Sequence, residues 1–548
     1  MKHNKFETHL CNNKMTFQEC ELSILRHAVD ESEKVSKKRI TENPDITRMM
    51  NILEGFLRSK KLICYGGLAI NNILPKEVQF YDRDIEIPDY DFYSPRAMEH
   101  AIELADLFFK NGFEEVEAKA GVHYGTFKVF VNFIPIADIT YLHRGIFKEI
   151  KKDSIIVDGI LYAPPNFLRM NIFLELSRPA GDVSRWEKVL KRLNLLNEYY
   201  PIQLPTRKCN EIEIQRKMDS KVMIDQDTIY NVVRDELVRL KVVFFGGYAS
   251  SLYARYIDHN HQKSFIMKIP DFDILSEDAN KVADTVVKKL KDLGIHNCRK
   301  ILHSEVGEII PKHYEIAIGD DTIAFVYEPI ACHSYNTIYM HDKEIRVATI
   351  DTMLTFYLAF YYSNKPYYYR DRILCMVKIL FDVEQKNRLV QKGLLKRFSI
   401  SCYGKQKTLD EIRSDKAKQF EVLKNSRNSK EYNMWFLKYS PKKDNQIKFS
   451  RSQSRPVAKK LPEVLPLTPV TKSPSSVIQS PSYNVTKKRF ASSGLREETK
   501  FLDANDTDVE RPTTEKVKTK KWRMPIPRIG WSTVKPSLPN IPRIPYFH

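Results

Sequence analysis

Two aspartates separated by one residue are the first candidates for chemistry. Asp89 and Asp91 lie in Ile87–Phe92, where polar and apolar residues alternate as in a half-buried strand. Successive strand side chains point to opposite faces, so both carboxylates are predicted to project from one face. Neighbouring carboxylates repel each other unless a cation lies between them, and ligands that offer only oxygen suit Mg²⁺ or Mn²⁺. The pair therefore predicts a divalent-metal site.

A glycine pair precedes these aspartates. Leu62–Tyr65 reads as a short apolar strand, Gly66-Gly67 as a turn, and Leu68–Leu74 as the first turns of a helix. Glycines let the backbone approach a ligand closely, and the helix N-terminus offers free N–H groups to phosphate. Together with the aspartates, this turn predicts a metal and triphosphate site.

A third carboxylate is predicted to complete the group. Asp138 lies in Phe133–Ile139, which reads as a strand entered from Phe127–Val131 through a hairpin-like turn at Asn132. We expect Asp138 to lie beside Asp89 and Asp91 on a neighbouring strand.

These motifs resemble the nucleotidyltransferase superfamily of DNA polymerase beta, which combines a glycine turn, an Asp-x-Asp strand and a third aspartate on a later strand. The variant in Tyr65–Asn71 and Ile87–Phe92 is similar to the poly(A) polymerases of large cytoplasmic DNA viruses, of the giant-virus or asfarvirus type and, more distantly, of poxviruses. The resemblance covers about 62–195 and extends to about 380 through an internal repeat. Leu68 departs from the superfamily's usual hydroxyl residue, which leaves only backbone contacts to phosphate there.

The resemblance implies template-independent addition of AMP from ATP to the 3′ end of mRNA, with Mg²⁺ or Mn²⁺ as cofactor. It implies that Asp89 and Asp91 bind both metals, that Asp138 binds the metal at the primer hydroxyl, and that Gly66 and Gly67 hold the β- and γ-phosphates. Three cations could also contact the triphosphate, although each could equally be a surface charge on an amphipathic helix: Arg178, Arg185 and Lys188. A nucleotidyltransferase of other specificity and a catalytically inactive RNA-binding scaffold remain alternatives.

The second half repeats the first. Phe244–Ala249 echoes the glycine turn and Ile269–Ile274 echoes the Asp-x-Asp strand, with Gly246 at an offset of 180 from Gly66 and Asp271 at an offset of 182 from Asp89. The third acid is not clearly repeated, because its place is expected to fall on Tyr327 or Glu328. The second site is therefore predicted to be incomplete.

Composition sets the outer limits. The net charge is +19, and residues 441–548 hold 22 Lys and Arg against 9 Asp and Glu, a difference of +13. This proline-, serine- and lysine-rich segment predicts a disordered basic tail that binds RNA, a solvated linker or a packaging tail. The expected order is N-terminal helices at 1–60, a catalytic nucleotidyltransferase domain at 61–200, a second, inactive one at 201–400, a helical extension at 401–440 and the tail. The fold class is α+β, each domain being a mixed sheet with flanking helices.

The eight cysteines show no CxxC pair, so neither zinc nor a disulfide framework is expected. No apolar run is long enough to cross a membrane, and no signal-like region follows Met1. We expect the protein in the host cytoplasm, at the viral factory, or packaged in the virion. ATP and RNA 3′ ends are the expected partners, with a homodimer or a processivity subunit as a further possibility.

Overall fold

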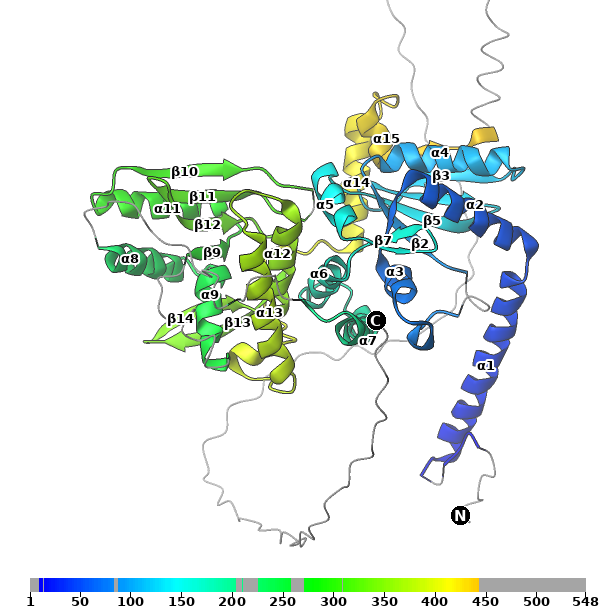
Figure 1. Cartoon of the computed structure of the whole chain (residues 1–548), viewed down its shortest axis with the longest axis horizontal. Coiled ribbons are helices and arrows are strands. Elements are labelled where there is room, and N and C mark those ends of the chain that lie inside the picture. The colour runs from blue at the N-terminus through cyan, green and yellow to red at the C-terminus, as the bar shows by residue number, and fades with distance from the viewer. Residues whose placement is uncertain are drawn as a thin grey trace, which may run out of the picture. The chain divides into compact units, whose positions relative to one another are not determined.

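The computed structural model describes residues 9–12, 14–82, 87–203, 209, 225–257, 271–307 and 309–442. These residues form two mixed β-sheets with flanking helices (Figure 1). The predicted α+β class with tandem domains is confirmed. The predicted basic tail lies outside the described residues from position 443 onward.

The first sheet contains the predicted catalytic strands. Its order is β16 (Lys438–Tyr439), β3 (Val116–Ala120), β4 (Thr126–Val131), β5 (Ile134–Tyr141), β2 (Tyr90–Ser94), β1 (Ile63–Cys64), β7 (Ile160–Tyr162) and β6 (Ile155–Val157). The flanking helices are α1 (Phe17–Thr41), α2 (Pro44–Lys60), α3 (Gly66–Ile73), α4 (Ala97–Lys110), α5 (Arg144–Lys152), α6 (Pro165–Leu176) and α7 (Trp186–Tyr199).

The second sheet repeats this design. Its order is β10 (Cys298–His303), β11 (His313–Ile318), β12 (Asp321–Tyr327), β9 (Phe272–Leu275), β8 (Val243–Phe245), β14 (Lys343–Ala348), β13 (His333–Met340) and β15 (Cys402–Tyr403). Its helices are α8 (Gln226–Arg239), α9 (Gly246–Tyr253), α11 (Ala279–Asp292), α12 (Ile350–Ser363) and α13 (Arg370–Lys386). Apart from the edge strands β16 and β15, the two orders correspond strand for strand, and each neighbouring pair has the same direction in both sheets. The predicted duplication is therefore present at the level of topology.

The two faces of the first sheet have different tasks. Tyr90 and Phe92 are fully buried, and the Tyr90 hydroxyl donates to Glu54 Oε1 of α2 at 2.6 Å. Because strand side chains alternate, Asp91 points to the opposite face, where α3 begins. Figure 1 shows α4 on one side of the sheet and α3 on the other. One face thus builds the core and leaves the other for chemistry.

Helices α6 and α12, which occupy equivalent places in the two halves, pack against each other. The Phe167 ring of α6 lies edge-on to Tyr93 at 5.8 Å and to Tyr362 of α12 at 5.3 Å between ring centroids. The backbone N–H of Ser334 also donates to Ser177 O at 2.8 Å. The two halves therefore share an apolar and hydrogen-bonded boundary.

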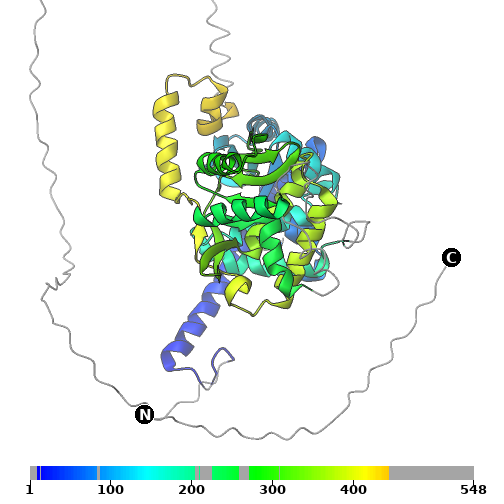
Figure 2. The same cartoon turned by 90° about the vertical axis from the view of Figure 1, so that its left-hand side faces the viewer.

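The region 401–440 does more than extend the chain by helices. It contains α14 (Leu409–Leu423) and α15 (Lys430–Phe436), but β15 pairs with β13 and β16 pairs with β3. Each sheet therefore gains an edge strand from this region. Helix α1 is mostly exposed, since among its described side chains only Cys20 is buried (Figure 2).

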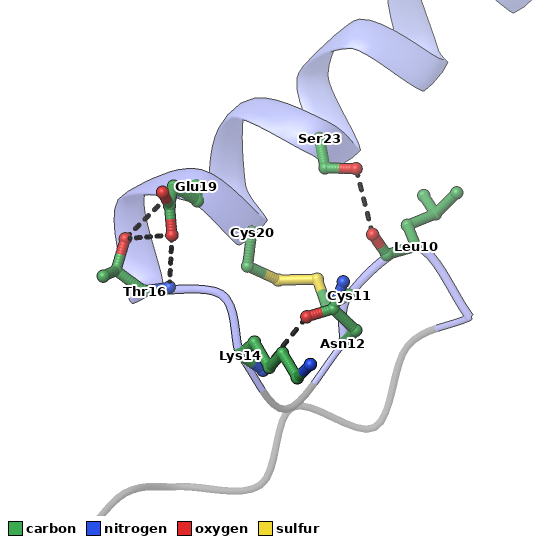
Figure 3. Close-up of a disulfide and its surroundings, with 8 residues drawn as sticks. All are labelled: Leu10, Cys11, Asn12, Lys14, Thr16, Glu19, Cys20 and Ser23. Carbon is green, nitrogen blue, oxygen red and sulfur yellow. Dashed lines mark hydrogen bonds between the residues drawn. A yellow bond between two sulfur atoms is a disulfide. The ribbon is translucent and has the colours of Figure 1, made fainter. Parts of the chain in front are cut away.

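The expectation of no disulfide framework is wrong. Three pairs are joined: Cys11 with Cys20, Cys209 with Cys375, and Cys332 with Cys402. The partners lie 9, 166 and 70 positions apart, so only folding brings the last two pairs together. Figure 3 shows the first pair fastening the chain before α1, where Ser23 Oγ donates to Leu10 O at 2.9 Å.

The boundary between α6 and α12 predicts a large stability cost for Phe167→Ala. The side chain is fully buried, so its loss leaves a cavity and should lower the free energy of unfolding by about 3–5 kcal/mol. The matched control is Phe133→Ala, whose side chain is 81% exposed, and it should change stability by less than about 0.5 kcal/mol. Denaturant unfolding measures both, and equal losses would contradict this account of the boundary.

Candidate active site

The register of two parallel strands brings the carboxylates together. Strand β2 pairs with β5 so that Asp91 lies opposite Asp138, and Asp89 directly precedes β2. Residues opposite each other in neighbouring strands point to the same face. The expected position of Asp138 beside the Asp89 and Asp91 pair is confirmed.

Burial and mutual repulsion act strongly on these groups. The pKa of Asp91 is raised to about 7, first by burial and then by the negative charges of Asp89 and Asp138. Asp89 is exposed at the rim of the site. Partial desolvation by the surrounding protein nevertheless raises its pKa, and the negative charge of Asp138 raises it further. The site therefore holds an excess of negative charge that favours a cation.

One protein cation already meets this charge. Lys128 lies opposite Asp138 on β4, and its ammonium forms an ion pair with the Asp138 carboxylate. In the described part of the chain, no three His, Cys, Asp or Glu side chains are already gathered as a metal-ligand cluster. The donor set nevertheless fits Mg²⁺ or Mn²⁺ chemically, since it consists of carboxylate oxygens whose repulsion a divalent cation would relieve.

The glycine turn touches the same carboxylates. Gly66 has φ of +75°, and a Cβ at this position would lie 2.8 Å from Asp91 Oδ2. A Cβ at Gly67 would lie 2.7 Å from both Arg192 Nη2 and Tyr81 Oη. The predicted order of strand, glycine turn and helix is present, but β1 ends at Cys64, one residue earlier than predicted, and α3 begins at Gly66, two residues earlier than predicted. The turn therefore brings its backbone against Asp91, Arg192 and Tyr81, with no room for side chains.

A cavity of about 950 Å³ opens over this turn. Its walls come from the turn, the carboxylate strand, α6 and α7, and its lining includes Tyr65, Tyr81, Asp89, Asp91, Tyr93, Leu168, Asn171, Ile172, Glu175, Arg185, Lys188, Val189 and Arg192. A volume of this size is within the usual range for small-molecule sites. Carboxylates, a glycine turn and cations thus face one space.

Two of the three predicted cations line this cavity. Arg185 and Lys188 do so, and Arg185 Nε also pairs with Glu175 Oε1 at 3.1 Å. Arg178 is not among the lining residues; it follows α6 and lies near the buried ring of His333. A role for Arg178 at the triphosphate is therefore not supported by its position.

Arg192 is a lining cation that the sequence analysis did not select. Its Nη2 donates to the Tyr81 hydroxyl at 2.6 Å, and its guanidinium lies 5.1 Å from the Phe80 ring centroid. Asn71 Oδ1 holds this aromatic segment by accepting from the backbone N–H groups of Phe80 and Tyr81. Spacing contained the signal: Arg185, Lys188 and Arg192 follow an i, i+3, i+7 pattern, which lies on one helix face.

The equivalent place in the second half is closed. Strand β12 pairs with β9 so that Phe325, not Tyr327 or Glu328, lies opposite Asp273. The predicted position was wrong by two or more residues because the loops between the motifs differ in length, but the predicted lack of a third acid stands. A Cβ at Gly246 would overlap Asp273 and one at Gly247 would overlap Asp271.

A salt bridge occupies this second site. Arg372 Nη2 lies 3.3 Å from Asp271 Oδ1, and Asp271 and Asp273 are only 6% and 8% exposed. Asp89, by contrast, is open to solvent. Buried carboxylates packed onto the glycine turn and paired with arginine leave no space there for a triphosphate.

The segment that carries these motifs is also the segment that resembles a known protein family. Residues 51–182, which contain the glycine turn and all three aspartates of the first half, match the family model described as "Poly(A) polymerase catalytic subunit". The resemblance predicted from the sequence is confirmed. The match contains every strand of the first sheet except β16, so the likeness to this family concerns that part of the chain.

Two curated relatives, both named "Putative poly(A) polymerase catalytic subunit", are similar over part of the chain. The African swine fever virus protein (isolate Pig/Kenya/KEN-50/1950) is 33% identical over 174 residues, which cover 31% of this chain and 36% of the relative. The Acanthamoeba polyphaga mimivirus protein is 31% identical over 207 residues, which cover 36% of this chain and 34% of the relative. The matched region therefore spans about a third of the length of these relatives.

A solved structure extends the likeness in fold. The Megavirus polyadenylate synthase superposes with a TM-score of 0.65 over 82% of this chain and 93% of its own, at 19% sequence identity. At this identity the likeness shows the fold alone.

No helix in the described ranges is both long and apolar enough to span a membrane.

The raised pKa of Asp91 predicts a pH-dependent gain in stability for Asp91→Asn. An unfolded aspartate titrates near pH 4 and the folded one near 7, so folding is penalised increasingly between these values and fully above 7. In metal-free buffer the variant should melt above the wild type by about 2 °C or more at pH 8 and by less at pH 5. Thermal melts at both pH values measure this difference.

The control for that comparison is Asp292→Asn, at an exposed position near the end of α11. Its melting difference from the wild type should be small at both pH values. A gain for Asp91→Asn that is the same at pH 5 and pH 8 would contradict the charge repulsion described for the first site.

Proposed function

We propose that the first half catalyses template-independent transfer of AMP from ATP to the 3′ end of RNA. One observation carries this proposal: Asp91 lies opposite Asp138 and against the Gly66 turn, in one cavity with α7 cations. Phosphoryl transfer needs positioning and charge stabilisation of phosphate oxygens, and these groups supply both. The acceptor 3′-oxygen would bond to the α-phosphorus while pyrophosphate leaves.

Each group then has a separate task. Gly66 and Gly67 present backbone N–H groups to the terminal phosphates, and Arg185, Lys188 and Arg192 offset phosphate charge from the facing helix. Asp89, Asp91 and Asp138 would hold the divalent cations, which when bound lower the pKa of the acceptor hydroxyl and neutralise the phosphates. Lys128 forms an ion pair with Asp138 and would have to give way to a metal.

The choice of adenine and of RNA rests on the relatives. The names of the matched proteins and of the family refer to poly(A). The residues that match the family model include Gly66, Gly67 and all three aspartates. The word "subunit" in those names also supports a processivity partner as part of the proposal. We further propose action in the host cytoplasm, at the viral factory, with packaging in the virion.

Nucleotide addition to an oligoribonucleotide, tested with each of the four triphosphates, examines the proposal directly. We expect long products with ATP only. Asp89→Asn should reduce the rate by about 100-fold or more, because a metal ligand carries several kcal/mol of transition-state stabilisation. Extension with another nucleotide alone would indicate a transferase of different specificity, and no extension would indicate a scaffold.

The equivalent substitution in the second half is the matched control. Asp271→Asn keeps the volume and an oxygen acceptor for Arg372 but removes the charge that compensates it, so the variant should melt below the wild type and yet retain most of the activity. Melting curves that show both variants folded at the assay temperature establish the comparison. An inactive Asp271→Asn beside an active Asp89→Asn would transfer the chemistry to the second half.

Removal of divalent ions should abolish nucleotide addition. Carboxylate oxygens bind hard cations. Without a bound cation, the negative charges of Asp89, Asp91 and Asp138 would repel the negatively charged triphosphate. Rates measured after chelation, and again after Mg²⁺ or Mn²⁺ is restored, test this. Full activity in the presence of excess chelator would contradict the assignment of these residues.

A further inference from the structure

A row of charged side chains crosses the first sheet at the level of Asp91. The strand registers place one residue of each of β2, β5, β4, β3 and β16 directly opposite the next, in the order Asp91, Asp138, Lys128, Lys119 and Lys438. Residues that lie opposite each other in neighbouring strands point to the same face of a sheet. The two carboxylates are therefore continued by three lysines, here called the lysine row, on the face from which Asp91 reaches the cavity over the glycine turn.

The contacts of β16 fix the direction of the outermost lysine. Tyr439, which follows Lys438 in this strand, donates its hydroxyl to Asp106 Oδ1 of α4 at 2.6 Å. Helix α4 packs against β3, β4 and β5 on the core face of the sheet. Because successive strand side chains alternate, Lys438 points to the opposite face, beside Lys119.

The lysine row is open to solvent. The side chains of Lys128 and Lys119 are 42% and 41% exposed, and Lys438 is exposed as well. Lys128 pairs with Asp138 and Lys119 with Glu117. Like charges directly opposite each other in neighbouring strands destabilise a sheet, so a bound anion would relieve the repulsion among these ammonium groups.

The second half has the same scaffold without these lysines. On its strands β9, β12, β11 and β10 the residues directly opposite one another are Asp273, Phe325, Glu315 and Ile301. The places of Asp138, Lys128 and Lys119 thus hold a phenylalanine, a glutamate and an isoleucine. The fold therefore does not require the lysine row, which occurs in the half whose carboxylates are open and is missing from the half whose carboxylates are closed.

The dimensions of the lysine row fit a linear polyanion. Neighbouring strands lie about 4.8 Å apart, so the row leads about 14 Å from the strand of Asp138 to the edge of the sheet. None of its lysines is among the residues that line the cavity over the glycine turn, to which the triphosphate is assigned. It begins instead beside Asp138, the carboxylate assigned to the acceptor hydroxyl. The acceptor chain is therefore the polyanion that the row fits.

We propose that the lysine row binds the backbone phosphates that precede the 3′-terminal nucleotide of the RNA acceptor and orients this chain across β4 and β3 to the edge strand β16. The inference rests on the proposed function. Ammonium groups neutralise phosphates without reading bases, which suits an acceptor of any sequence. Lys128 leaves Asp138 when a cation takes that carboxylate and then binds the nearest phosphate.

Loss of the two outer lysines should weaken binding of RNA. Each phosphate contact of a single strand contributes about 0.7 to the slope of log affinity against log salt, which is about fivefold in affinity at 0.1 M salt. A protein with Lys119→Met and Lys438→Met should therefore bind fluorescent oligo(A) about 25-fold more weakly, with a salt slope smaller by about 1.4. Anisotropy over a salt series, without ATP, measures both. In extension assays the KM for ATP should stay within about twofold of the wild-type value.

Two further double variants are the controls. Lys60→Met with Lys110→Met removes the same charge at α2 and α4, where Lys60 pairs with Glu103 and Lys110 is exposed, and affinity for oligo(A) should change by less than about twofold. Lys119→Arg with Lys438→Arg keeps the charge of the row and should bind as the wild type does. Melting curves establish that all three double variants are folded.

Neutral linkages locate the contact on the RNA. An oligo(A) whose last three linkages are uncharged methylphosphonates should bind the wild type more weakly, whereas the Lys119→Met and Lys438→Met protein should bind it almost as well as it binds natural oligo(A). Losses that simply add, wild-type affinity of the methionine variant, or a KM for ATP that rises as much as the KM for the primer would overturn the proposal.

Failure of this inference and failure of the proposed function give different results. A wild type that extends primers, beside a methionine variant that binds them normally, would contradict the lysine row alone. A methionine variant with weakened RNA binding, beside a wild type that extends no primer with any triphosphate, would contradict the proposed function alone.

Discussion

The repulsion among three aspartates, held together by the pairing of β2 with β5, is the constraint on which the first half depends. Parallel pairing fixes Asp91 opposite Asp138, and the same alternation buries Tyr90 and Phe92 on the other face. The sheet therefore uses core packing on one side to hold like charges on the other. The raised pKa of Asp91 reflects this repulsion together with burial, and a bound cation would relieve the repulsion.

The second half shows the same scaffold without that constraint. Its strand order and directions correspond to the first, yet Phe325 replaces the third carboxylate and Arg372 neutralises Asp271. Because Arg372 compensates the charge of Asp271, both aspartates of the second half can be less than 10% exposed and pack directly against Gly246 and Gly247. The two copies therefore separate what the fold requires from what the chemistry requires.

Local sequence patterns predicted most of the first site, whereas features set by distant contacts escaped them. Gly66, Asp89, Asp91 and Asp138 were accessible because each motif is a short strand or turn with its own periodicity. Three things were not: the register that places Phe325 opposite Asp273, the disulfide partners 70 and 166 positions apart, and the edge strand β16 supplied by residues far along the chain. Each depends on loop lengths or tertiary packing that no local window contains.

The basic side chains that follow α6 and those that precede and belong to α7 lie in different surroundings. Lys188 and Arg192 of α7, with Arg185 directly before its first residue, line the cavity over the glycine turn, whereas Arg178, which follows α6, lies near His333 of the second half. Helix α6 thus faces the cavity over the glycine turn through Asn171 and packs on α12 through Phe167. Helix α6 also lines a second cavity, whose other residues include Thr355, Phe356 and Ala359 of α12, so loss of the second half would remove both that wall and the packing that positions α6. That dependence gives a closed copy a physical reason to persist beside an open one.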